Sequence, residues 1–309
     1  MSLLSTEQLK NLSDFVQRTD LSKMAIFLDV DQTIVLEQKG KIYFTRSVER
    51  GIKDIHDLRI PVVLNTLRFP LSVIRTLGEE WYKIVKDRIP VVLLNGSMCG
   101  YIEKDHFGRL EFTELESFPL SESEIDFVIK EIKYLCNENV RGILLFFYPR
   151  DWKSGEIIWT PDADQVQTLK EKYTSASNVI STKLAELEII LKTDEICMIF
   201  RHIETPQDHL MAYQHSGRSM FVTRKGVDKA FGAKQIAKKL NKPIDLKQSL
   251  GAGDTTMDTF LNEMAFDVHV GTNVLPFQGS FCTVMVKDPL ELGEILFAFA
   301  DFAKSKLKL

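Results

Sequence analysis

Three apolar segments near the N-terminus constrain the fold most strongly. They run over residues 24–30, 60–66 and 89–96, and each is apolar along nearly its whole length. The stretches between them, 47–58 and 71–84, carry apolar residues three and four positions apart, which predicts amphipathic helices. Strands that are apolar on both faces belong in a parallel sheet covered by helices on each side. The pattern therefore predicts an α/β fold built around a parallel sheet.

The pattern changes after residue 98 and returns near the C-terminus. In the middle of the chain we expect helices at 121–135 and 178–192 and shorter strands at 142–148, 195–200 and 219–224. The first pattern then returns, with helices expected at 230–240, 257–265 and 289–303 and strands at 249–253, 267–271 and 283–286. We expect a Rossmann-like parallel-sheet core made of residues 1–98 and 225–309, with an α+β domain inserted at 99–224.

Composition and charge argue against several classes of protein. The 309 residues carry a formal net charge of −4, without the basic excess expected of a protein that binds nucleic acid or a membrane surface. No apolar run approaches the roughly 20 residues of a membrane span. The four cysteines are scattered, which favours reduced thiols in a cytoplasmic protein. No GxGxxG or P-loop pattern follows a strand, so neither a nicotinamide enzyme nor a P-loop nucleotidase is indicated.

Polar side chains stand at or shortly after the ends of the expected core strands, and a lysine precedes the expected helix 230–240. The set comprises Asp29, Asp31, Thr33, Asn65, Thr66, Lys229, Asp254 and Asp258. Open α/β sheets bind ligands at the carboxyl ends of their strands, so we expect these side chains to lie close together. Carboxylates at this density repel one another unless a cation lies among them. Oxygen ligands without histidine or cysteine select Mg²⁺.

The same set suits phosphoryl transfer. A lysine and a threonine hydroxyl are suitable partners for a phosphoryl group beside Mg²⁺, and an aspartate can attack phosphorus. We expect transfer of the phosphoryl group to Asp29 and then to water. Asp31 is placed for acid–base work, because residues i and i+2 of an extended segment point the same way.

Four segments, taken in order, resemble the motifs of a known superfamily. DVDQT (29–33), LNT (64–66), Lys229 and GDTTMD (253–258) are similar to the four motifs of the haloacid dehalogenase superfamily. The NG at 95–96 and the GVDK ending at Lys229 resemble its Cof-type, sugar-phosphatase branch. That branch carries a large cap between the second and third motifs and includes trehalose- and sucrose-phosphate phosphatases. The cap of this chain matches in placement and size rather than by motif.

The resemblance implies a role for each matching residue. Asp29 would be the nucleophile and Asp31 the general acid and base. The phosphoryl group would be bound by Thr66, Asn65 and Lys229. The Mg²⁺ ligands would be Asp29, the backbone carbonyl of Asp31, Asp254 and Asp258. The implied activity is that of a Mg²⁺-dependent phosphatase acting on a small phosphorylated metabolite, with sugar phosphates as the guide to substrate class.

Three positions depart from the family pattern, and two other functions stay open. Gln32, Leu67 and Met257 stand where glycine, glycine and asparagine are common. One alternative is a sugar phosphomutase or phosphotransferase, in which the phosphoryl group passes to a sugar rather than to water. The other is a catalytically weak sugar-phosphate-binding regulatory protein on the same fold, which the three departures motivate. The sequence does not name the oligomeric state.

Overall fold

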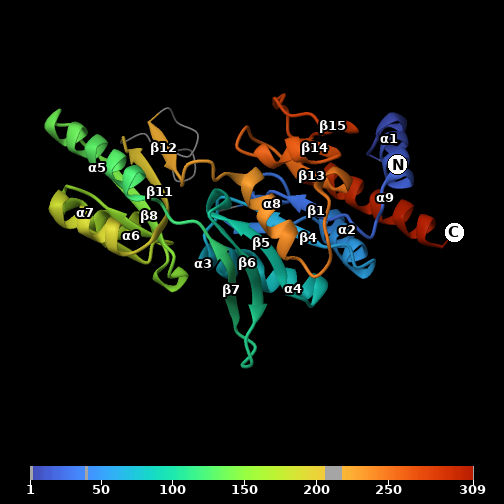
Figure 1. Cartoon of the computed structure of the whole chain (residues 1–309), viewed down its shortest axis with the longest axis horizontal. Helices are drawn as coiled ribbons and strands as arrows, with labels where there is room; N and C mark the ends of the chain where they lie inside the picture. Colours follow the sequence, from blue (N-terminus) through green and yellow to red (C-terminus); the bar gives the residue numbers. More distant parts are fainter. Residues whose placement is uncertain (1–2, 39–40, 206–217, 309) are drawn as a thin grey trace. The chain divides into compact units, whose positions relative to one another are not determined.

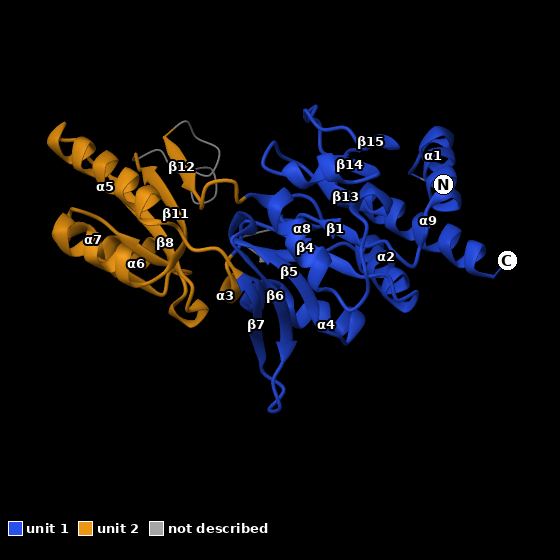
Figure 2. Cartoon of the chain, viewed as in Figure 1, with its two compact units in different colours: residues 1–68, 73–116, 228–309 blue, residues 69–72, 117–227 orange. Residues whose placement is uncertain are grey.

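The chain divides into two compact units. The computed structural model describes residues 3–38, 41–205 and 218–308. Unit 1 comprises residues 1–68, 73–116 and 228–309, and unit 2 comprises residues 69–72 and 117–227 (Figure 2). Each unit has its own sheet and its own buried apolar cluster.

Unit 1 is built on one large sheet of eight strands, in the order β15-β14-β13-β1-β4-β5-β6-β7 (Figure 1). The strands are β1 Ile26–Leu28, β4 Val62–Asn65, β5 Ile89–Leu93, β6 Met98–Lys104, β7 Leu110–Ser117, β13 Leu250–Gly253, β14 Phe266–Val270 and β15 Cys282–Val286. From β15 to β5 all neighbours pair in parallel, whereas β6 pairs antiparallel with β5. The predicted α/β fold with a parallel core is therefore confirmed.

Helices pack on both faces of this sheet. They are α1 Thr6–Arg18, α2 Arg46–Asp57, α4 Glu79–Val85, α8 Lys229–Lys239 and α9 Pro289–Leu307, together with the π-helical turn Ile74–Gly78. The short helix α3 Pro70–Val73 falls mostly in unit 2. Helices α2 and α9 lie against each other so closely that a Cβ atom on Gly51 would stand 2.6 Å from the Cβ of Leu296. The absence of a side chain at Gly51 is what allows this approach.

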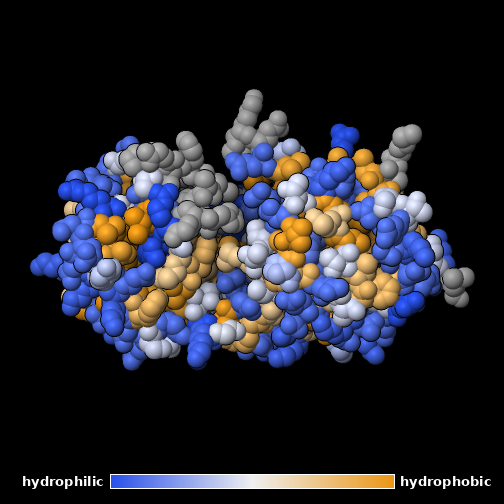
Figure 3. All heavy atoms as spheres, turned by 90° about the horizontal axis from the view of Figure 1, so that it is seen from above, coloured by the Kyte–Doolittle hydropathy of each residue, from blue (hydrophilic) through white to orange (hydrophobic). Residues whose placement is uncertain are grey.

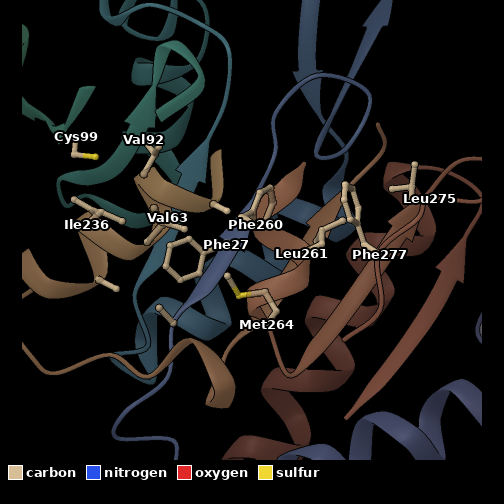
Figure 4. Close-up of a cluster of buried hydrophobic side chains, with 14 residues drawn as sticks. Phe27, Val63, Val92, Cys99, Ile236, Phe260, Leu261, Met264, Leu275 and Phe277 are labelled. Atoms are coloured by element: carbon tan, nitrogen blue, oxygen red, sulfur yellow. The ribbon is translucent and has the colours of Figure 1, made fainter. Parts of the chain in front are cut away.

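Helix α8 and the 3₁₀ turn Thr259–Glu263 cover one face of the unit 1 sheet. The alternation of strand side chains sends Phe27, Val63 and Val92 to this face, where they form one fully buried cluster with residues of α8 and of the turn (Figure 4). The cluster also contains Phe260, Met264 and Ile236, among others. It fixes α8 and the 3₁₀ turn to the central strands, and both carry residues of the predicted site.

Unit 2 is an α+β unit with a five-stranded sheet, in the order β10-β9-β8-β11-β12. The strands are β8 Ile143–Pro149, β9 Ile157–Trp159, β10 Asn178–Ile180, β11 Ile196–Ile203 and β12 Ser219–Val222, and the helices are α5 Glu122–Asn137, α6 Val166–Lys172 and α7 Leu184–Thr193. Leu145, Phe147 and Ile199 pack with apolar residues of α5 and α7 into one core. Unit 2 therefore buries its own apolar surface.

The structure differs from the sequence analysis at several elements. The sequence predicts that residues 99–116 belong to the inserted domain, but β6 and β7 extend the sheet of unit 1, so the insertion begins at residue 117. Residues 178–180 form β10 rather than the first turn of a helix, because they pair with β9. The helix expected over 257–265 is the shorter 3₁₀ turn Thr259–Glu263. A hairpin of β2 Val35–Gln38 and β3 Lys41–Phe44 was not predicted.

The surface mixes polar and apolar side chains. On the face drawn in Figure 3, orange apolar residues stand in small groups among blue hydrophilic ones. Within the described ranges, none of the helices has the length and apolar character needed to cross a membrane.

Candidate active site

Asp29 directly follows the central strand of the unit 1 sheet. Strand β1 lies between β13 and β4, and the Asp29 backbone N–H donates to the carbonyl oxygen of Ala252 on β13, 2.9 Å away. The side chain is almost fully buried, at 5% exposure. Burial raises the pKa of Asp29 well above its usual range, and the charge of Lys229 opposes this shift. The structure thus holds a carboxylate inside the protein at the carboxyl edge of the sheet.

Lys229 is the main neutralising partner of Asp29. It is the first residue of α8, which is capped by Asp228 accepting a hydrogen bond from the Phe231 N–H. The Lys229 Nζ lies 2.6 Å from Asp29 Oδ1 and 2.6 Å from Asp258 Oδ1, with its side chain 3% exposed. Burial lowers the pKa of Lys229, but the charges of Asp258 and Asp29 outweigh burial and leave its pKa above the ordinary value. The lysine is therefore held charged.

Asp254 and Asp258 stand in one tight turn after β13. The Asp258 Oδ2 accepts hydrogen bonds from the backbone N–H groups of Asp254 and Thr255, each at 2.9 Å. A Cβ atom on Gly253 would stand 2.6 Å from the Asp258 carboxyl carbon, so this approach requires glycine. Thr33 Oγ1 links the turn to β1, because it lies 3.3 Å from Asp29 Oδ2 and 3.2 Å from Asp254 Oδ1.

These carboxylates fit a hard divalent cation. Asp29, Asp254 and Asp258 each offer an oxygen, and the three oxygens lie within 4.8 Å of one another. Burial, and after it the charge of Asp258, raise the pKa of Asp254 to about 6. A donor set of oxygens alone suits Mg²⁺. Asp258 already accepts from Lys229 and from two backbone N–H groups, so Asp29 and Asp254 have the more available oxygens.

Asp31 has a different environment from Asp29. Its side chain is 38% exposed, and both of its carboxylate oxygens contact the guanidinium of Arg68. Arg68 follows Thr66 by two residues and was not singled out from the sequence. The sequence does carry a signal for it, since a basic residue follows, by two positions, a threonine expected to bind phosphate. The proton-transfer role of Asp31 and the metal contact of its carbonyl stay predictions.

Thr66 and Asn65 lie at the end of β4, and both are buried. The Thr66 Oγ1 accepts from the Arg68 backbone N–H at 3.2 Å, so its own hydroxyl hydrogen is the donor it can offer to a phosphoryl oxygen. Asn65 Nδ2 donates to the Lys229 carbonyl oxygen at 3.0 Å. That bond uses one of its two amide hydrogens and ties β4 to the start of α8. Phosphate binding by either residue stays a prediction.

The structure describes the backbone at all three positions that depart from the family pattern. Gln32 has a φ of 58°, the left-handed conformation that glycine adopts without strain. Leu67 is not among the described residues with a positive φ, so its backbone does not require glycine. Met257 is half-buried, and its N–H donates to Thr255 Oγ1 inside the turn.

Comparison with known proteins decides the family. A family model described as haloacid dehalogenase-like hydrolase matches residues 26–265, which is more than half of the chain. The chain belongs to the haloacid dehalogenase-like hydrolases. The family expected from the four sequence segments is therefore confirmed. The comparison with curated proteins found no significant match.

Solved structures with the same fold span nearly the whole chain. A protein from Plasmodium vivax described as a HAD/COF-like hydrolase has a TM-score of 0.62 and 19% identity, covering 96% of this chain and 99% of its own. A haloacid dehalogenase-superfamily phosphatase from Bacteroides thetaiotaomicron has a TM-score of 0.62 and 15% identity, covering 92% and 97%. A sugar phosphatase of subclass IIB has a TM-score of 0.59 and 16% identity, covering 90% and 98%. At these identities the likeness concerns the fold.

Proposed function

We propose that this haloacid dehalogenase-like hydrolase is a Mg²⁺-dependent phosphatase that acts on a small phosphorylated metabolite, a sugar phosphate, through an aspartyl-phosphate on Asp29. The arrangement of Asp29 carries the proposal. A carboxylate lies buried at the end of the central strand, 2.6 Å from a buried lysine and beside two further acids. Such an arrangement lowers stability, and buried charges of this kind are concentrated at functional sites.

The proposed reaction has two steps. A carboxylate oxygen of Asp29 attacks phosphorus, the bond from phosphorus to the leaving oxygen breaks, and that oxygen takes a proton from Asp31. Water then attacks phosphorus, gives its proton to Asp31, and releases Asp29 and inorganic phosphate. Lys229 offsets the negative charge of Asp29 and of the phosphoryl group. Mg²⁺, held by Asp29 and Asp254 with support from Asp258, supplies further positive charge when bound.

One observation supports the substrate class, and another supports the role that we assign to unit 2. One structural neighbour is described as a sugar phosphatase. Unit 2 joins unit 1 between Val227 and Asp228, next to the lysine that enters the acid cluster. We assign to unit 2 the choice of substrate, because an insertion at this point can vary without changing the strands that hold the acids.

Phosphate release from p-nitrophenyl phosphate tests the proposal. Asp29→Asn keeps the shape of the side chain but removes the nucleophile, so we expect Mg²⁺-dependent turnover to fall by about 10³-fold or more. Asp301→Asn, an exposed change on α9, is the matched control and is expected to leave the rate unchanged. Equal rates for Asp29→Asn and wild type contradict the mechanism.

A panel of phosphorylated metabolites then tests the substrate class. We expect the highest kcat/KM for sugar phosphates, measured as inorganic phosphate released. Release of phosphate separates hydrolysis from transfer to a second sugar, which leaves phosphate bound in an organic product. Binding of sugar phosphates by calorimetry without turnover points to the regulatory alternative and overturns the proposal.

A further inference from the structure

Arg68 holds both oxygens of the Asp31 carboxylate. Its Nε donates to Asp31 Oδ2 at 2.9 Å, and its Nη2 donates to Asp31 Oδ1 at 2.5 Å. This two-point arrangement fixes the plane of the carboxylate as well as its position, which a single hydrogen bond does not do. The Arg68 side chain is 13% exposed, so solvent competes weakly for it.

Arg68 is itself fixed by neighbours within unit 1. Its Nη1 donates to Thr76 Oγ1 at 3.0 Å, in the π-helical turn Ile74–Gly78. Its backbone N–H donates to Thr66 Oγ1, and its carbonyl oxygen accepts from the Leu94 N–H at 3.2 Å. Single π-helical turns are frequent at functional sites. Arg68 is thus held at its backbone by Thr66 and Leu94 and at its guanidinium by Thr76.

The Asp31 side chain needs a partner that holds its orientation. It follows β1 and precedes Gln32, whose left-handed backbone turns the chain, and its side chain is much more exposed than that of Asp29. A half-exposed aspartate side chain rotates among several orientations when nothing holds it. A proton donor works only within hydrogen-bond reach of the atom that receives the proton.

We propose that Arg68 is a positioning residue that orients the Asp31 carboxyl group for proton transfer to the leaving oxygen. The inference rests on the proposed phosphatase function. In the first step Asp29 attacks phosphorus and the leaving oxygen takes the Asp31 proton as its bond to phosphorus breaks. In the second step water returns a proton to Asp31. Arg68 gains and loses no proton in either step.

The dependence of rate on the leaving group separates this role from a merely structural one. p-Nitrophenyl phosphate and phenyl phosphate have nearly the same shape, but nitrophenolate departs without a proton far more readily than phenolate. Loss of an oriented proton donor therefore slows phenyl phosphate more than p-nitrophenyl phosphate. Loss of folded protein or of phosphate binding slows both substrates by the same factor.

The experiment compares kcat/KM for both substrates in wild type and Arg68→Ala. We expect the ratio of p-nitrophenyl to phenyl phosphate to rise by about 10-fold or more, within the range that general acid catalysis supplies. An unchanged ratio in an active Arg68→Ala protein overturns the inference while leaving the proposed function standing. Absence of Mg²⁺-dependent release in wild type overturns the proposed function instead.

Further variants keep the test decisive. In an Asp31→Asn background, Arg68→Ala is expected to leave the ratio unchanged, because the residue through which it acts is gone; a further rise contradicts the inference. Thr76→Val removes only the outer support and is expected to raise the ratio less, which also serves if Arg68→Ala does not fold. Arg50→Ala, an exposed change on α2, is the control for loss of an arginine.

Discussion

At the scale of single residues, Gln32 shows what the first turn of the site requires. After Gln32 the backbone N–H groups of Thr33, Ile34 and Val35 all point to the carbonyl oxygen of Val30. This tight turn brings Thr33 Oγ1 to Asp29 and Asp254. Its geometry requires a φ of 58° at Gln32, which costs a residue with a side chain roughly 1–2 kcal/mol.

Substitution of Gln32 tests this strain. Gln32→Gly is expected to leave the free energy of unfolding unchanged or raised by up to about 1 kcal/mol, because relief of strain exceeds the added freedom of the unfolded chain. Gln32→Val is expected to lower it by about 1–2 kcal/mol, because a β-branched residue avoids this conformation. Urea denaturation measures both values.

A control separates backbone strain from the general cost of valine. Gln17→Val replaces an exposed glutamine on α1, where the backbone is helical, and is expected to cost only a few tenths of a kcal/mol. Equal losses for Gln17→Val and Gln32→Val contradict a left-handed Gln32.

At the scale of elements, the first turn of α8 decides where Lys229 lies. Asn65 holds the Lys229 carbonyl oxygen, and Thr259 Oγ1 accepts from the Ala230 N–H at 3.0 Å. The turn at Gly96 approaches so closely that an added Cβ atom would stand 2.0 Å from the Asp228 carbonyl oxygen. Three separate segments therefore hold the turn from which the lysine reaches the acids.

Gly96→Ala tests this packing against a matched control. Gly96 and Gly271 have similar φ values of 96° and 99°, but a Cβ atom on Gly271 meets nothing within 4 Å. Both changes carry the cost of strain, roughly 1–2 kcal/mol, and Gly96→Ala adds a clash with backbone. We expect it to lower the free energy of unfolding by at least about 1 kcal/mol more than Gly271→Ala in urea denaturation. Similar losses contradict the close approach.

At the scale of the whole molecule, the predicted metal ligands all belong to unit 1. Asp29, Asp254 and Asp258 fall within its residues, and unit 2 has a separate sheet and core. A ligand that binds only the folded form stabilises that form, by about 2.7 kcal/mol at 100 times its Kd. Mg²⁺ is therefore expected to stabilise one unit selectively.

Hydrogen exchange followed by mass spectrometry reports on each unit separately. We expect added Mg²⁺ to slow exchange in β1, β13 and α8 of unit 1 and to leave β8 and β11 of unit 2 unchanged. Asp254→Asn is expected to abolish the effect, whereas Asp301→Asn keeps it. Equal protection of both units, or protection that persists in Asp254→Asn, contradicts the assigned ligands.

Much of the core was accessible from the sequence, because buried parallel strands and their helices carry local patterns. The segments 24–30, 60–66 and 89–96 all contain strands of the unit 1 sheet. The residues at their ends include Asp29, which the structure brings to Lys229. The assignment of residues 99–116 to the insertion failed for a physical reason. Antiparallel strands such as β6 extend a sheet through pairing with β5, and nothing local to their sequence names that partner.

The sequence by itself determined the buried parallel strands of the core, the family and the acids at the strand ends, because each of these depends on short-range pattern. Only the tertiary structure decided which partner each acid has. Asp29 is paired with a buried lysine 200 residues away, and Asp31 is paired with Arg68. Both aspartates end the same strand, so local sequence treats them alike. Their surroundings come from segments that meet only after folding. These segments bury Asp29 and hold the half-exposed carboxylate of Asp31.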